Sequence, residues 1–121
     1  ALPAASIGLG CGFTPARKLL DSGACLAIGS DWNPGSAPMG QLLTSASILA
    51  TAEKLSNAEL LAALTYRAAK ALNLSDRGTL KEGMRADFTL FKTDNYQNIT
   101  YHQGSMQPQA VWKDGVEVFS I

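Results

Sequence analysis

The chain has 121 residues, 46% of them apolar and 17% charged, which is the composition of a globular chain and not of a disordered one. Ten basic and ten acidic side chains cancel, and no basic cluster is present, so nucleic acid and anionic membranes are poor candidates as partners. The apolar runs are too short for a membrane span, no signal peptide is recognisable, and two cysteines are too few for a disulfide framework. We therefore expect a soluble cytoplasmic protein with reduced thiols.

The first predicted unit is a short helix followed by a buried strand. In "GFTPARKLLDSG", Thr14 is a suitable cap, Pro15 suits the first helical position and Gly23 suits the end. Ala24–Ser30 is apolar on both faces, as in a strand of a parallel sheet that is covered on both sides. A helix, a glycine turn and a buried strand make half of a β/α unit.

Two helices are predicted next. Residues 41–55 carry apolar side chains at helical spacing. A second helix begins at Ser56, where "SNAE" forms a capping box with Glu59, and it runs to about Leu72. Its predicted apolar stripe is Leu60, Leu61, Leu64, Ala68 and Leu72.

The C-terminal part has the pattern of a small β region. Residues 78–92, "GTLKEGMRADFTLFK", are punctuated by glycine and then alternate, which predicts short strands. Residues 109–121 predict a hairpin with Asp114–Gly115 at its turn. The polar stretch between them, residues 93–109, is predicted as a loop.

The stretch "AIGSDWNPGS" (27–36) raises the question of function. An apolar run ends at Asp31, and Trp-Asn-Pro-Gly follows at once. These residues form turns in many proteins. They equally suit the edge of an active site, where a strand ends in a carboxylate and a loop surrounds it.

Several motifs resemble one family. "GSDWNPGS", "LTYRAAKALNL", "RGTLKEGMRADFTLF" and "VWKDGVEV" resemble the C-terminal third of the amidohydrolase superfamily, and Asp-x-Asn-Pro-Gly-Ser is most similar to its imidazolonepropionase branch. The resemblance implies an α/β fold: the C-terminal portion of a (β/α)8 amidohydrolase barrel over residues 1–76, and part of a small β-sandwich domain over residues 77–121. Ala24–Ser30 would be the last barrel strand, with Asp31 just past its end.

The resemblance also implies a reaction and its residues. The activity would be metal-dependent hydrolysis of a cyclic amide, imidazolone propionate, to N-formimidoyl-glutamate in histidine degradation. Asp31 would ligate one divalent metal, zinc or iron, and would carry a proton from the attacking water to the departing ring nitrogen. Asn33 and Gly35 would contact the ring-opened product, and Ser36 the imidazolone propionate. From the residues alone, Asn33 and Gly35 can also be turn formers.

The chain lacks most of the metal ligands that this family needs. It contains one histidine, His102, which falls in the predicted loop, whereas a catalytic metal takes about three protein ligands. We therefore expect an incomplete site, inactive alone, whose partner is the missing N-terminal part of the same enzyme; a homo-oligomer is left open. Asp87 is expected to be structural, anchoring the sandwich to the barrel, and Cys25 to be inert packing.

Two alternatives stay open. One is another hydrolase or deaminase of the superfamily, such as formimidoyl-glutamate deiminase or a cytosine or guanine deaminase; Asn33–Ser36 argues against it. The other is a catalytically inactive module that folds by oligomerisation, with Ala24–Ser30 in a self-complementary interface.

Overall fold

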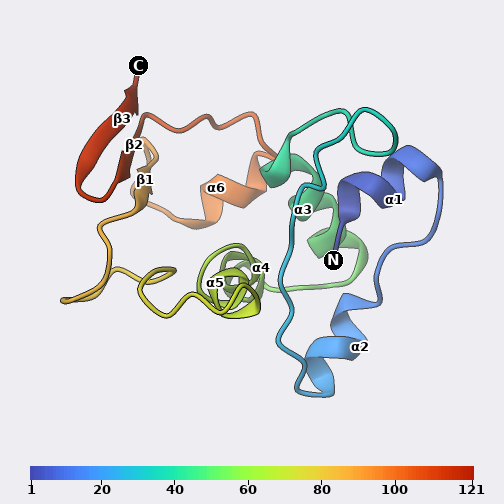
Figure 1. Ribbon diagram of the computed structural model, residues 1–121. Coiled ribbons are helices and arrows are strands. Elements are labelled where there is room, and N and C mark those ends of the chain that lie inside the picture. The colour runs from blue at the N-terminus through green and yellow to red at the C-terminus, as the bar shows by residue number, and fades with distance from the viewer.

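The computed structural model describes all residues, 1–121, as a group of helices beside a small sheet. In Figure 1 the helices α1, α2 and α3 lie on the right, α4 and α5 in the lower middle, the sheet at the upper left, and α6 between the sheet and α3. The elements are α1 (Pro3–Leu9), α2 (Ala16–Asp21), α3 (Leu42–Ala52), α4 (Asn57–Leu64), α5 (Tyr66–Ala71), β1 (Phe88–Leu90), α6 (Gln97–Tyr101), β2 (Ala110–Lys113) and β3 (Val116–Ser120). No helix has the length and apolar character needed to cross a membrane.

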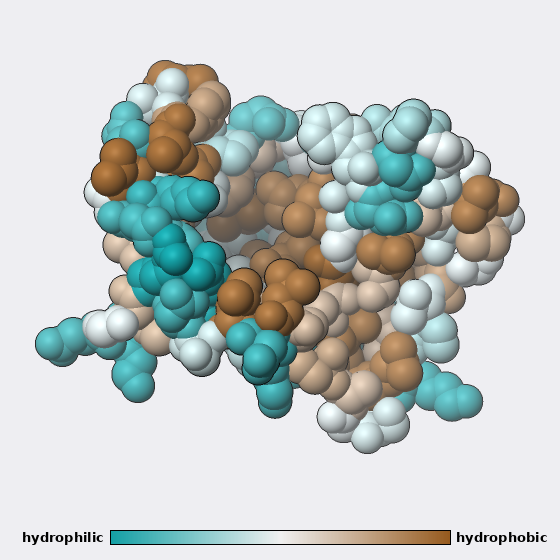
Figure 2. Space-filling view, in the orientation of Figure 1, coloured by the Kyte–Doolittle hydropathy of each residue, from teal (hydrophilic) through white to brown (hydrophobic).

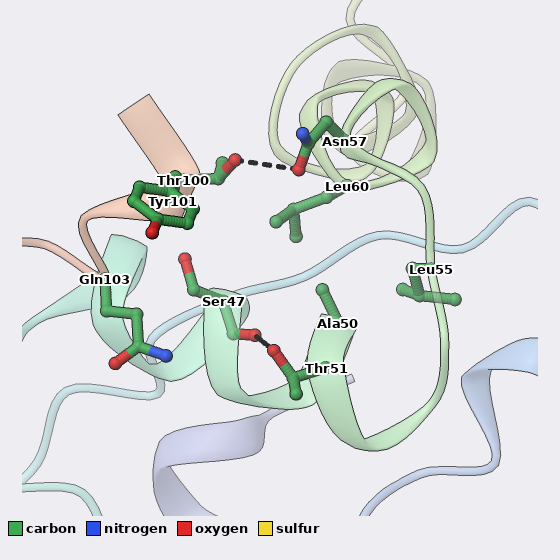
Figure 3. Close-up of a pocket in the computed structure, with 9 residues that line it drawn as sticks. All are labelled: Ser47, Ala50, Thr51, Leu55, Asn57, Leu60, Thr100, Tyr101 and Gln103. Atoms are coloured by element: carbon green, nitrogen blue, oxygen red, sulfur yellow. Dashed lines mark hydrogen bonds between the residues drawn. The ribbon is translucent and has the colours of Figure 1, made fainter. Parts of the chain in front are cut away.

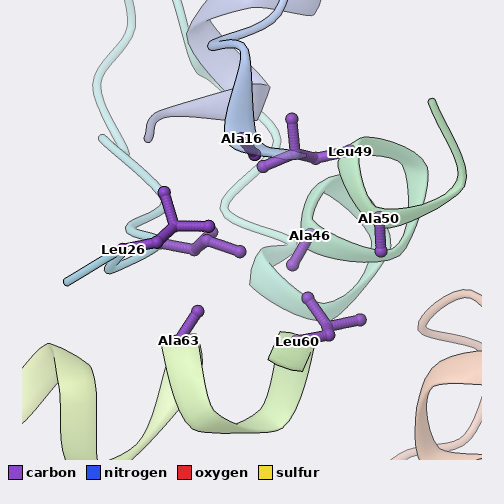
Figure 4. Close-up of a cluster of buried hydrophobic side chains, with 8 residues drawn as sticks. Ala16, Leu26, Ala46, Leu49, Ala50, Leu60 and Ala63 are labelled. Atoms are coloured by element: carbon purple, nitrogen blue, oxygen red, sulfur yellow. The ribbon is translucent and has the colours of Figure 1, made fainter. Parts of the chain in front are cut away.

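The buried core joins α2, α3 and α4 to the segment 24–30 (Figure 4). Alanines let these elements approach closely, and the leucine and isoleucine side chains fill the space between them. Burying one such large side chain contributes roughly 1.5–3 kcal/mol. The core residues are Ala16, Leu26, Ile28, Ala46, Leu49, Ala50, Leu60 and Ala63.

The segment 24–30 is not a strand in this structure, so that prediction is wrong here. The sheet contains only β1, β2 and β3, and a parallel strand forms only where a neighbouring strand supplies a hydrogen-bond ladder. The backbone of the segment bonds elsewhere: the Ile28 N–H donates to the Ala63 carbonyl at 3.1 Å, and the Gly29 N–H donates to the Ala1 carbonyl at 3.0 Å.

The side chains of this segment are buried on one face only. Leu26 and Ile28 are each 4% exposed, whereas Cys25 is an exposed free cysteine. The expectation that Cys25 is buried packing is therefore also wrong in this structure. An apolar pattern on both faces shows that both faces suit burial, but it cannot show that the chain itself supplies both covers.

The first helix was not predicted, and the second begins one residue later than predicted. Helix α1 was not predicted, although Pro3 lies in its first turn and Gly10, with φ +64°, ends it. Helix α2 begins at Ala16, one residue later than predicted, with Pro15 at the cap position. The cap assigned to Thr14 is absent; instead its carbonyl accepts from the Ala16 N–H at 2.7 Å.

The capping box is confirmed, but the helix after it is interrupted. The Glu59 N–H donates to Ser56 Oγ at 3.2 Å, and the Ser56 N–H donates to Glu59 Oε2 at 2.8 Å. The predicted continuous helix to Leu72 breaks at Thr65, where φ is −122° and ψ −102°. Gly78 packs on the break, because a Cβ there would lie 2.7 Å from the Tyr66 Cα.

The C-terminal strands form one antiparallel sheet in the order β1-β2-β3. The predicted hairpin is confirmed: Asp114 and Gly115 turn the chain with φ +54° and +77°. Phe88 stacks on Trp112, its partner on β2, with ring centroids 4.7 Å apart. A second sheet layer is not formed within this chain, so the β-sandwich stays a prediction, as do the boundaries 1–76 and 77–121.

The stretch 93–109 is not wholly loop, because α6 forms within it. Asn95 Oδ1 accepts from the Gln97 N–H at 3.0 Å, and the Asn95 N–H donates to Thr93 Oγ1 at 3.1 Å. These local side-chain bonds organise the start of the helix, which the polar composition of the stretch concealed.

Candidate active site

The residues predicted to carry chemistry lie together in one exposed loop, 31–37. Asp31 follows the segment whose Leu26 and Ile28 side chains enter the core, so the core fixes the approach to the loop. Asp31 is exposed, and its φ of +49° turns the chain sharply. The loop closes where the Asn33 N–H donates to the Ala37 carbonyl at 3.2 Å.

The Asn33 amide holds this loop together. Its Oδ1 accepts from the Gly35 N–H at 2.8 Å and from the Ser36 N–H at 2.9 Å. Its Nδ2 donates to the Asp31 carbonyl at 2.5 Å and to Ser36 Oγ at 3.2 Å. The loop is therefore a turn with one defined shape, and that shape leaves the Asp31 side chain exposed.

The Trp32 side chain lies against Gly40, just beyond the loop. Its side chain is 73% exposed, yet its ring lies against Gly40, where a Cβ would come within 2.9 Å of Trp32 Cε2. Gly40 has φ +60°, so both its backbone conformation and the close ring favour glycine.

The residues of this chain do not by themselves form a metal centre. Nowhere in residues 1–121 do three or more His, Cys, Asp or Glu side chains come together in a way that could hold a metal ion. Asp31 offers one carboxylate. His102 lies directly after α6, and its ring is nearly perpendicular to the Tyr101 ring, with the two centroids 5.3 Å apart. The donor set therefore does not fit a complete metal site.

A second charged cluster attaches the hairpin to the segment before β1. Asp87 Oδ1 accepts from the Asp114 N–H at 2.8 Å. The Asp87 carboxylate also lies 3.9 Å from Arg77 Nη1 and 3.7 Å from Arg85 Nε, and Arg85 pairs with Asp114. These contacts are those of a structural anchor within residues 77–121; the expected role of Asp87 between sandwich and barrel stays a prediction. The sequence analysis did not predict that Arg77 and Arg85 take part in this cluster. The neighbouring opposite charges in "SDRG" and "MRAD" are the signal that could have indicated them.

Two cavities lie away from the loop. A mainly apolar one of about 670 Å³ is bounded by α4, α5 and β1, and Figure 2 shows apolar surface around a hollow between the sheet and the helices. A smaller one of about 300 Å³ lies between α3, α4 and α6, where Thr100 Oγ1 donates to Asn57 Oδ1 at 3.0 Å (Figure 3). Neither is lined by a residue of the loop 31–37.

Comparison with known proteins defines the class. The sequence profile of the amidohydrolase family matches residues 2–118, so the chain belongs to that family. Within it, the chain is 39% identical over 120 residues to the imidazolonepropionase of Deinococcus deserti, and 38% identical over 117 residues to that of Deinococcus radiodurans. Each alignment covers 97% of this chain and 29% of the relative. The resemblance to imidazolonepropionases is thus confirmed, and the chain spans about 29% of their length.

A solved structure supports the same fold class. The adenosine deaminase of Xanthomonas campestris, with bound zinc, matches with a TM-score of 0.81 and 28% identity, over 98% of this chain and 31% of that one. The elements are therefore arranged as in part of an amidohydrolase. This agrees with a chain that makes up part of an α/β amidohydrolase fold; the barrel itself stays a prediction.

Proposed function

We propose that the complete protein hydrolyses a cyclic amide, most specifically imidazolone propionate to N-formimidoyl-glutamate in histidine degradation. The observation that carries the proposal is the exposed Asp31 carboxylate at the start of a loop shaped by Asn33, in a chain whose relatives bear the name imidazolonepropionase. Because the chain spans about 29% of those relatives, the activity belongs to the complete enzyme.

Each loop residue has a role in this proposal. Asp31 accepts a proton from the attacking water while the new C–O bond forms at the ring carbonyl. It returns that proton to the ring nitrogen as the C–N bond breaks. Asn33 and Gly35 contact the ring-opened product, and Ser36 contacts the imidazolone propionate. Since the Asn33 amide is engaged inside the loop, its effect on the substrate also includes the shape it gives to the loop.

The proposal includes one divalent metal, zinc or iron, in the complete protein. The amidohydrolase neighbour from Xanthomonas campestris holds zinc. Asp31 would supply one oxygen ligand, and the other ligands must come from outside these 121 residues because no sufficient group exists within them. The chain alone is accordingly proposed to be inactive.

A cytoplasmic location completes the proposal. Cys11 and Cys25 are both free and exposed. Exposed free thiols persist most readily in a reducing compartment.

The substrate test uses the complete protein with imidazolone propionate and, separately, with the amino-substituted rings adenosine, guanine and cytosine. Product formation is followed as N-formimidoyl-glutamate or as released ammonia. We expect turnover of imidazolone propionate only. Ammonia release from an amino-substituted ring, without imidazolone turnover, would replace the proposal with a deaminase, the alternative that the likeness to an adenosine deaminase favours.

The Asp31 test uses Asp31→Asn, which keeps the size of the side chain and removes its charge. We expect turnover to fall by about 10²–10⁴-fold, as for loss of a proton-transfer group. Asp94→Asn is the matched control, because Asp94 is exposed and takes part in none of the ion pairs. Equal turnover in the two variants would remove Asp31 from the mechanism.

A further inference from the structure

Helix α1 touches the candidate loop backbone to backbone, at Gly8. A Cβ placed on Gly8 would lie 1.8 Å from the Ser36 carbonyl oxygen and 2.9 Å from its carbonyl carbon. Such distances are shorter than any van der Waals contact. Neither helix nor loop can therefore keep its position if residue 8 carries a side chain.

The helix itself gives no reason for a glycine at this place. Gly8 lies inside α1 and does not have the positive φ found at Gly10. Inside a helix, alanine is more favourable than glycine. The close approach to Ser36 is thus the physical reason for glycine here.

Ala1, two residues before helix α1, contacts the segment that leads into the loop. The Gly29 N–H, two residues before Asp31, donates to the Ala1 carbonyl at 3.0 Å. Pro3 and Ala4 of α1 are buried, and α1 packs against α3. The chain just before Asp31 therefore contacts Ala1, and Ser36 contacts Gly8, so the loop is held at both ends.

We propose that Gly8 is a positioning residue: by allowing α1 to contact the Ser36 carbonyl, it sets the Ser36 end of the loop and thereby the affinity for imidazolone propionate. The inference rests on the proposed function, in which Ser36 contacts this substrate. Gly8 itself need not contact the substrate. Displacing Ser36 should weaken substrate binding while Asp31, at the other end of the loop, still acts.

The test compares Gly8→Ala with Gly12→Ala in the complete protein. Gly12 is the matched control because a Cβ there meets nothing within 4 Å and its φ is not positive. Gly8→Ala is expected to raise KM for imidazolone propionate about tenfold, the effect of losing about one hydrogen bond, with kcat changed less than about threefold.

Hydrogen exchange of a peptide covering 31–37 provides a second readout that needs no activity. Gly8→Ala should speed exchange there, and Gly12→Ala should not. If the wild-type protein does not hydrolyse imidazolone propionate, the proposed function fails, while exchange still decides whether Gly8 positions the loop.

Two results would overturn the inference: unchanged KM and exchange in Gly8→Ala, or the same changes in Gly12→Ala. If Gly8→Ala does not fold, Ala5→Gly replaces it, because this change weakens α1 without adding a clash. Ala5→Gly should also raise KM and the rate of hydrogen exchange in residues 31–37. Unchanged values in that variant would also contradict the inference.

Discussion

At the scale of single residues, the Asn33 amide decides the shape of the loop after Asp31. Its oxygen satisfies two backbone N–H groups that would otherwise face solvent, those of Gly35 and Ser36. Its nitrogen bonds to the Asp31 carbonyl. Turn formation and site geometry are therefore one property of this residue, and the two interpretations of "SDWNPG" do not exclude each other.

Replacing Asn33 tests this coupling. Asn33→Ala removes the acceptor oxygen, and each hydrogen bond lost should destabilise the loop by about 1 kcal/mol. Amide hydrogen exchange at Gly35 and Ser36 should therefore become faster. We also expect kcat/KM to fall at least tenfold. Asn33→Asp keeps an acceptor oxygen and should retain most of the protection. If the Gly35 and Ser36 amides of Asn33→Ala exchange as slowly as in the wild type, the Asn33 side chain does not order the loop.

The loop could be predicted from the sequence, but its support could not. Asp31, Asn33, Gly35 and Ser36 are consecutive or nearly so, and turn chemistry acts over a few residues. Gly8 carries no comparable signal, because a glycine in a short helix does not reveal which distant backbone approaches it. Its role became visible only through the contact with Ser36.

At the scale of elements, an ion pair joins α2 to the start of α4. Arg17 Nη1 and Nη2 donate to the two carboxylate oxygens of Glu59, each at 3.0 Å, and the same carboxylate accepts from the Ser56 N–H. The hydrogen bonds from Arg17, followed by the bond from Ser56, lower the pKa of Glu59 from 4.5 to about 2. One carboxylate therefore serves as cap and as link between helices.

Glu59→Gln should lower stability in a pH-dependent way. Because the folded-state pKa of Glu59 is depressed, its contribution is fully present above pH 4.5 and is lost as the pH falls toward about 2. Both side chains are partly exposed, so we expect a loss of about 1 kcal/mol near pH 7. Thermal melting of both proteins should show a Tm difference at pH 7 that narrows at pH 3. A Tm difference that stays constant with pH would contradict the assignment. Asp94→Asn serves as the control, because Asp94 is exposed and takes part in none of the ion pairs.

Asp87 is predicted to stabilise the hairpin and to take no part in catalysis. Asp87→Ala removes the acceptor of the Asp114 N–H and the partner of Arg77 and Arg85, which should cost about 1–3 kcal/mol and lower Tm. Asp87→Asn, which keeps the acceptor, should lose less. KM and kcat measured below the melting range should stay within about twofold of the wild type; a selective loss of kcat would instead place Asp87 in the site.

Elements were predictable where local chemistry fixes them. The Ser56–Glu59 box and the Asp114–Gly115 turn are set by residues adjacent in sequence. The break at Thr65 depends on the close approach of Gly78, and the backbone of segment 24–30 bonds to Ala1 and Ala63 in the absence of a neighbouring strand. Such distant partners leave no trace in the periodicity of the segment itself.

At the scale of the whole molecule, the chain corresponds to only part of the amidohydrolases that it resembles. It matches the amidohydrolase family over residues 2–118 and spans about 29% of the relatives. It contributes an exposed carboxylate on a well-shaped loop, yet it contains no group of ligands sufficient for a metal. In the proposed function, Asp31 would complete a metal site whose other ligands lie in the rest of the protein.

Native mass spectrometry of the protein purified from its source tests this claim most directly, because one spectrum gives chain mass and bound metal. We expect a chain mass well above 12.8 kDa and about one bound zinc or iron ion. The Asp31→Ala variant should lose that ion. A metal-free 12.8 kDa chain, alone or self-associated, would contradict the claim and support the non-catalytic module.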